Sequence, residues 1–179
     1  MQQNRARRIW VLDEGLFAYA RGTPQYDASE SIRLAFERLM KKLGPSTLFT
    51  VGYPPPVNFF VALGTQGKAY VLGHGSRETV GGHDPTEIAH GLVLYGGLSS
   101  GCTVTLVSCN TATSGWLSKS FAKKLNAALL QCGCDCDVVG RTGVTTVTPQ
   151  GQVRTYKSWI SQLLTGERYK SPLQGKLRY

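Results

Sequence analysis

Two stretches of the chain, Tyr70-Val-Leu-Gly-His-Gly-Ser76 and Val104-Thr-Leu-Val-Ser-Cys-Asn110, decide the fold. Each is a short apolar run, typical of a buried strand, that ends in small residues and in one chemically capable residue, His74 or Cys109. If the two strands are parallel neighbours, their carboxyl ends lie about 5 Å apart. We therefore expect His74 and Cys109 to converge, although 35 residues separate them (109 − 74).

Short strands and amphipathic helices alternate along the rest of the chain. Helices are expected from Asp27 to Leu43 and from Asp84 to about Leu94, because each aspartate is a natural N-cap with a glutamate three residues later, as in a capping box. A third helix is expected over 118–130 and a last one over 158–164. The strands predicted from short apolar runs are 9–12, 47–51, 58–63, 68–72, 103–107 and 137–140.

This alternation predicts an α/β fold with a mostly parallel central sheet and helices on both faces. Two further runs, Val144 to Val147 and Gln152 to Tyr156, flank Thr-Pro-Gln-Gly and predict a C-terminal β-hairpin. In open parallel sheets the ligand site lies beyond the carboxyl ends of the strands. His74 and Cys109 stand at that edge.

The length of 179 residues fits one domain, since domains average about 150 residues. We expect residues 1–8 to be frayed, 9–164 to form the domain and 165–179 to be a basic tail. No apolar run is long enough to span a membrane, and Asp13 with Glu14 interrupts the only apolar run near the start, so no signal peptide is expected. The five cysteines are an odd number without disulfide-framework spacing, which favours a reducing compartment such as the cytoplasm.

The charge of the chain is lopsided. It has 20 Lys+Arg against 11 Asp+Glu, a formal net charge of +9. Such an excess favours polyanionic partners: phosphorylated small molecules, nucleic acid or anionic membrane surfaces. No RNA-binding or helix-turn-helix motif is present, so a nucleic-acid partner is not expected.

A cysteine becomes a nucleophile when a nearby imidazole favours its thiolate. Gly73 and Gly75 flank the histidine, which lets the backbone pass close to a substrate and present an amide to an oxyanion. The competing interpretation is that Cys109 is an inert small apolar residue and His74 a hydrogen-bonded surface residue.

The order of these segments carries a resemblance. Tyr70–Ser76, then Gly81-Gly82 and Pro85-Thr-Glu-Ile-Ala89, then Val104–Asn110 resemble the caspase-like (clan CD) cysteine peptidases, above all the self-cleaving cysteine protease domains of large bacterial toxins. The matching order covers about residues 9–160. The resemblance implies a caspase-like three-layer sandwich whose C-terminal hairpin is a flap beside the site.

By that resemblance, Cys109 is the nucleophile and His74 the catalytic base, with Gly73, Gly75 and Ser108 binding substrate or oxyanion. The family's third group is an acidic residue that opens the first helix, a place that Asp27 matches. A plain helix cap is the alternative for Asp27, and Asp13 is a less favoured substitute.

The toxin domains are activated by inositol hexakisphosphate bound at a basic patch beside the flap. By resemblance, Arg141, Arg154 and Lys157 are candidates for that site; further cations follow at Lys170, Lys176 and Arg178. A solvated basic face is the alternative. No metal is expected, because Cys132, Cys134 and Cys136 lack a fourth ligand, and His83 is expected to be a loop histidine near the site.

The first hypothesis is therefore a cysteine endopeptidase with a Cys-His dyad, acting in the cytoplasm or, after secretion as a bacterial effector, in a host cytosol. Its substrate would be a host protein or the parent polypeptide of an autoprocessing toxin, cleaved beside leucine in the toxin-like case. The alternative is a non-catalytic scaffold or phosphate-sensing module of the same fold. A general nucleic-acid binder is a third interpretation.

Overall fold

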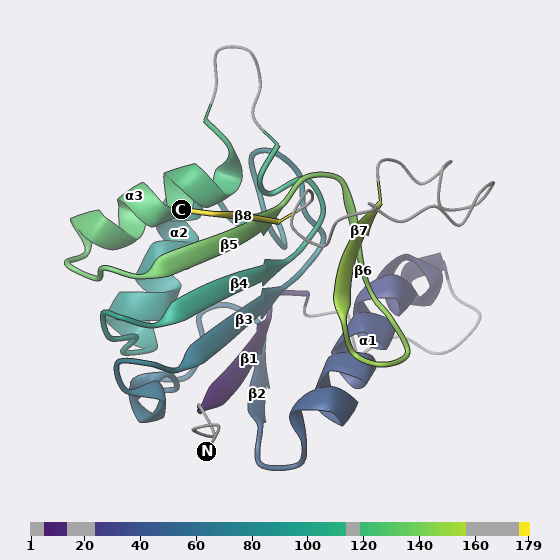
Figure 1. The fold of residues 1–179 in the computed structure, drawn as a ribbon, viewed down its shortest axis with the longest axis horizontal. Helices are drawn as coiled ribbons and strands as arrows, with labels where there is room; N and C mark the ends of the chain where they lie inside the picture. The colour runs from purple at the N-terminus through teal and green to yellow at the C-terminus, as the bar shows by residue number, and fades with distance from the viewer. Residues whose placement is uncertain (1–5, 14–23, 114–118, 157–175) are drawn as a thin grey trace.

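A six-stranded sheet forms the centre of the protein (Figure 1). The computed structural model describes residues 6–13, 24–113, 119–156 and 176–179. The sheet order is β2-β1-β3-β4-β5-β8, in which the first five strands are parallel and β8 is antiparallel to β5. The strands are β1 (Arg7–Val11), β2 (Leu48–Val51), β3 (Lys68–Leu72), β4 (Thr103–Val107), β5 (Asp137–Arg141) and β8 (Lys176–Arg178). The predicted α/β class with a mostly parallel sheet is confirmed.

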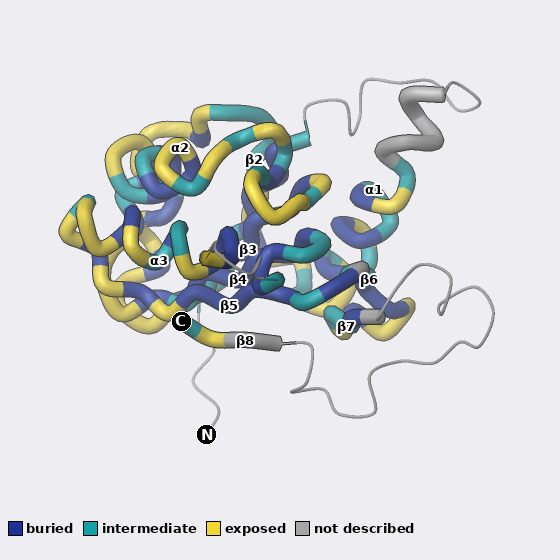
Figure 2. The backbone as a smooth tube through the Cα atoms, turned by 90° about the horizontal axis from the view of Figure 1, so that it is seen from above, coloured by how far each residue is buried: buried dark blue, intermediate teal, exposed yellow. Residues whose placement is uncertain are grey.

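Helices cover both faces of this sheet, as seen from above in Figure 2. Side chains of successive strand residues point to opposite faces, so Trp10 and Val71 pack in one apolar cluster, whereas Ile9 and Leu72 pack in another. The first cluster joins the sheet to α2 (Pro85–His90) and α3 (Phe121–Gln131). The second joins it to α1 (Pro24–Leu43).

Helix α1 begins three residues earlier than predicted. Pro24 is its first residue, and proline suits a first helical turn because its missing N–H would have no partner there. Asp27 therefore lies inside the helix, and its prediction as the N-cap is wrong. The predicted apolar stripe is present: Ile32, Phe36 and Leu39 are buried against the sheet.

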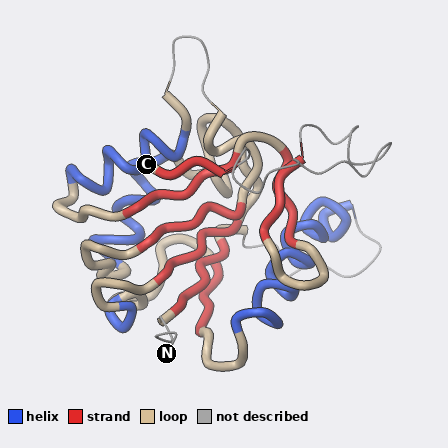
Figure 3. The backbone as a smooth tube through the Cα atoms, viewed as in Figure 1, coloured by secondary structure: helices blue, strands red, loops and turns tan. Residues whose placement is uncertain are grey.

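The strand predicted over 58–63 is absent from the structure. Asn58 has a φ of 61°, which breaks an extended backbone, and Val61–Leu63 form a 3-10 turn. The Asn58 and Phe60 amides donate to the Tyr95 and Gly96 carbonyls. The Phe60 side chain thus packs in the apolar cluster on the α2 side. The segment itself is not part of the sheet, whose strands are red in Figure 3.

The caps of the other two helices decide where they start. Asp84 accepts hydrogen bonds from the Thr86 and Glu87 amides in the predicted capping box, and α2 continues as a π-helical turn over Gly91–Tyr95. Helix α3 begins at Phe121, not at residue 118, because the Ser120 hydroxyl accepts from the Lys123 amide.

Strands β6 (Val144–Val147) and β7 (Val153–Tyr156) pair antiparallel in a separate two-stranded sheet on the α1 side of the molecule (Figure 1). Two terminal predictions need correction: Arg7 and Arg8 belong to β1 rather than to a frayed end, and Lys176–Arg178 of the predicted tail form β8. The helix predicted over 158–164 lies outside the described residues. Among the helices that are described, none has the length and apolar character that crossing a membrane requires.

Candidate active site

The carboxyl ends of three neighbouring strands bring the site together. Val11 of β1 pairs with Leu72 of β3, and Leu72 pairs with Val107 of β4. Asp13, His74 and Cys109 each lie two residues beyond one of these paired strand ends. They therefore leave the same edge of the sheet from adjacent strands.

The segments that carry His74 and Cys109 touch through their backbones. The Ser108 hydroxyl donates a 2.8 Å hydrogen bond to the Gly73 carbonyl. A Cβ built on Gly75 would lie 2.6 Å from the Cys109 carbonyl oxygen and 2.8 Å from its nitrogen, so only glycine allows this approach. The predicted Gly73, Gly75 and Ser108 thus hold the two segments together.

Among the described side chains, the acid beside His74 is that of Asp13. The Nε2 atom of His74 lies 3.7 Å from Oδ2 of Asp13, and the side chains are 58% and 22% exposed. That separation exceeds a hydrogen bond, as is common in unliganded catalytic sites. In a neutral imidazole whose Nε2–H faces Asp13, the lone pair is on Nδ1. The side chain of Asp27 is not among the described ones.

The hairpin contacts the nucleophile segment directly. The Thr145 amide donates to the Cys109 sulfur at 3.3 Å, and the Thr145 hydroxyl donates to the Ser108 carbonyl at 3.0 Å. The Asn110 amide donates to the Gly143 carbonyl at 2.9 Å. Sequence reasoning missed Thr145, since nothing in the sequence distinguishes it from neighbouring threonines.

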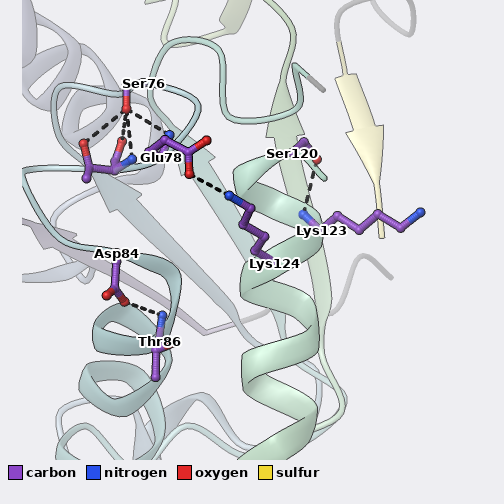
Figure 4. Close-up of polar contacts among 8 residues, drawn as sticks. Ser76, Glu78, Asp84, Thr86, Ser120, Lys123 and Lys124 are labelled. Atoms are coloured by element: carbon purple, nitrogen blue, oxygen red, sulfur yellow. Dashed lines mark hydrogen bonds and ion pairs between the residues drawn. The ribbon is translucent and has the colours of Figure 1, made fainter. Parts of the chain in front are cut away.

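The loop after His74 is fixed by its own polar side chains (Figure 4). The Ser76 hydroxyl accepts from the amides of Glu78 and Thr79 at 3.0 and 2.9 Å. The Glu78 carboxylate then pairs with Lys124 of α3 at 2.6 Å. These contacts tie the loop to α3 and hold its direction out of β3.

His83 lies in the same loop but has structural partners. Its ring stacks on Tyr53 with centroids 4.2 Å apart, and its Nδ1 lies 3.6 Å from the Glu87 carboxylate. Burial and the nearby Glu87 raise the pKa of Tyr53, which keeps that phenol neutral in the stack. The expectation of a loop histidine fits this arrangement.

A basic cavity of about 320 Å³ lies between the sheet, the end of α1 and the hairpin. Its lining brings the predicted Arg141 and Arg154 together with two cations that sequence reasoning missed, Lys42 and Lys68. None of the described lining residues is acidic. Arg141 is only 7% exposed, and burial together with the nearby Arg154 lowers the pKa of Arg141 to about 10.

The Nε atoms of both arginines are buried and have no hydrogen-bond partner within the described residues. Arg154 is half-buried and also donates from Nη2 to the Gln152 side chain, whereas Arg141 is buried. A buried cation with an unsatisfied donor is costly. Such a cavity therefore favours an anion. The predicted Lys157 lies outside the described residues.

Three of the other thiols, those of Cys102, Cys134 and Cys136, are buried away from this edge. The sulfurs of Cys134 and Cys136 are 3.3 Å apart and both side chains are buried, while burial raises the pKa of the nearby Cys102. The described residues contain no group of three or more potential ligands suited to a metal. Cys109 and Cys132 are the two partly exposed cysteines.

Comparison with protein-family models and with curated proteins finds no match for this chain. The functional argument therefore rests on the geometry of the site.

Proposed function

We propose that the protein is a cysteine endopeptidase of the caspase-like kind, with Cys109 as nucleophile and His74 as general acid and base. The observation that carries the proposal is the backbone contact between Gly75 and Cys109 at the carboxyl ends of β3 and β4. A helix layer on each face of a mostly parallel sheet is compatible with the caspase-like sandwich.

The reaction follows from these groups. The Cys109 thiolate attacks the scissile carbonyl carbon, and the carbonyl electron pair moves to oxygen. The tetrahedral intermediate collapses by breaking the C–N bond, and His74 gives its proton to the leaving amine. A water molecule, deprotonated by His74, then attacks the thioester and releases the carboxylic acid and the thiol.

Three further groups support this chemistry. We assign the amides of Gly75 and Cys109 to the developing oxyanion, because they belong to the two backbones that meet at the site. Asp13 orients the imidazole and stabilises its charged form. The hairpin β6–β7 lies beside the nucleophile, where an extended substrate would bind.

The substrate class is a protein chain: a host protein for a secreted effector, or the parent polypeptide of an autoprocessing toxin. The test incubates wild type, Cys109→Ala and the matched thiol control Cys132→Ala with a cell lysate and sequences new protein N-termini. We expect new termini with wild type and Cys132→Ala, and none with Cys109→Ala. Identical termini in all three samples, or none at all either with or without inositol hexakisphosphate, contradict the peptidase.

The basic cavity supports a second function, sensing of a polyphosphate. Four cations and no acid are found among its described lining residues, and the buried Nε of Arg141 has no partner in the part of the chain that the structure describes. Arginine forks match phosphate oxygens in pairs. By the resemblance to toxin domains, inositol hexakisphosphate is the proposed ligand, as an activator of the peptidase or as the signal read by a non-catalytic module.

Calorimetric titration with inositol hexakisphosphate, inorganic phosphate and a DNA duplex shows which of these ligands the protein binds. We expect binding of the inositol phosphate to weaken strongly in Arg154→Gln and to persist in Lys123→Gln, an exposed cation on α3. Equal binding by both variants contradicts the assigned site. Preference for DNA, with affinity falling steeply with salt, favours a nucleic-acid binder instead. Repeating the lysate experiment with the ligand shows whether cleavage depends on it.

A further inference from the structure

Thr145 links the hairpin to the segment after β4 through two hydrogen bonds: its amide donates to the Cys109 sulfur, and its hydroxyl donates to the Ser108 carbonyl. We propose that Thr145 is a positioning residue for the nucleophile: its amide holds the Cys109 sulfur, and its hydroxyl holds that amide in place by bonding the Ser108 carbonyl. The inference rests on the proposed function, because it concerns the reactivity of the same cysteine.

These hydrogen bonds form a clamp, which joins residues 143–145 to residues 108–110. Residues 143–145 of the hairpin bond residues 108–110 after β4: the Gly143 carbonyl accepts from the Asn110 amide, and Thr145 bonds both Ser108 and Cys109. Asn110 has a φ of 56°, a left-handed conformation that turns the chain directly after the cysteine. The direction of the Cys109 side chain is therefore set from both sides, by this turn and by the hairpin.

The pairing of the hairpin explains why the Thr145 amide is available. Thr145 lies opposite Thr155 in the antiparallel pair β6–β7. Along such a pair, residues alternately direct their N–H and C=O groups toward the partner strand and away from it. Because the Thr145 amide donates to Cys109, it lies in the set directed away from β7, and the contact with sulfur costs the hairpin no ladder hydrogen bond.

The same contact fixes the position of the reactive atom. A backbone N–H at 3.3 Å gives the Cys109 sulfur a set partner on the hairpin. It also restricts the rotation of the sulfur at the carboxyl end of β4, the strand that pairs with β3 before His74. The Thr145 hydroxyl, which donates to the Ser108 carbonyl, keeps the Thr145 amide from moving away from the sulfur.

The hairpin offers a matched set of variants. Thr145→Val removes the hydroxyl while keeping the β-branched shape and the amide, and Thr145→Ser restores the hydroxyl. Thr155→Val is the control, because Thr155 lies on the facing strand and its buried hydroxyl has no hydrogen-bond partner within the described residues. Thermal unfolding verifies that each variant is folded.

The measurement is the rate constant for alkylation of Cys109 by iodoacetamide at pH 7, followed by peptide mapping. We expect Thr145→Val to slow alkylation about 3- to 10-fold, the effect of losing roughly one hydrogen bond. Thr145→Ser and Thr155→Val are expected to stay within about twofold of wild type, because neither loses that bond. A purely structural role would not be rescued by serine, which lacks the methyl group.

A wild-type rate in Thr145→Val overturns the inference, and so does a serine variant as slow as the valine variant. The assay needs no peptide substrate, which separates this inference from the proposed function. A protein that shows the Thr145 dependence but cleaves nothing supports the clamp and contradicts the peptidase. A protein that cleaves through Cys109 without regard to Thr145 contradicts the clamp alone.

Discussion

The two faces of the central sheet are covered in different ways. On the α2–α3 face, Trp10, Phe60 and Phe121 belong to one closed apolar cluster. On the α1 face the apolar cluster is smaller, and the sheet also borders a basic cavity and the hairpin. One face is thus closed by apolar packing, while the other places charges and the β6–β7 pair beside the edge of the sheet that carries His74 and Cys109.

The largest expected effect is on catalysis. His74→Ala leaves both apolar clusters intact but removes the proton donor and acceptor. We expect the Cys109-dependent cleavage rate to fall by about 10⁴-fold or more, with the free energy of unfolding within about 0.5 kcal/mol of wild type. Cleavage assays and urea unfolding measure the two effects. A variant that retains a tenth of the activity would show that His74 has no such role.

The next effect is on the closed face. Phe121 is fully buried at the start of α3, and Phe121→Ala should lower the free energy of unfolding by about 3–5 kcal/mol, because it removes buried area and leaves a cavity. Urea denaturation measures the loss, and alkylation of Cys109 below the transition should stay near the wild-type rate. A loss under about 1 kcal/mol would mean that this face is not the stabilising one.

Variants of Asp13 and Asp27 distinguish the two candidates for the acid that orients His74. Asp13→Asn should reduce cleavage about 10- to 100-fold, less than in a buried triad because the 3.7 Å pair is partly exposed and screened. Asp27→Asn is the matched control and should change cleavage less than about twofold, since the residue lies within α1. The opposite ranking of the two variants would restore Asp27 as the catalytic acid.

The smallest effect concerns the open face. Burial lowers the pKa of Arg141 to about 10, which means that folding disfavours its charge at neutral pH. Arg141→Met should therefore raise the free energy of unfolding by about 1 kcal/mol in buffer without polyanions. Added inositol hexakisphosphate should raise the Tm of wild type and leave the Tm of Arg141→Met nearly unchanged. Equal shifts in both proteins would remove Arg141 from the anion site.

The central strands were predictable because their signal is local. The runs ending at Leu72 and Val107 are apolar, short and bounded by glycine or serine, and their parallel pairing follows from the helices between them. The convergence of the His74 and Cys109 segments then follows from the topology. The capping box of α2 was equally local, since the side chains of Asp84 and Glu87 each accept a hydrogen bond from the other residue's backbone amide.

The failures have a common physical origin, which is that the deciding contact is far away in sequence. Asp27 has the local signature of a cap, yet α1 begins at Pro24. Asp13, the less favoured acid in the sequence, lies beside His74 because β1 pairs with β3. The run from Asn58 is apolar enough for a strand, yet its amides bond the Tyr95–Gly96 turn. Thr145 reaches Cys109 only through the folded hairpin.

The central claim is that Cys109 is an activated nucleophile served by His74. Its most direct test is the alkylation of all five thiols at neutral pH, with each label mapped to its residue in wild type and in His74→Ala. The account predicts that Cys109 is labelled well before Cys132, the other partly exposed thiol, and that the preference disappears in His74→Ala. Equal rates at Cys109 and Cys132 in the wild-type protein, or a preference for Cys109 that survives the loss of His74, would contradict it.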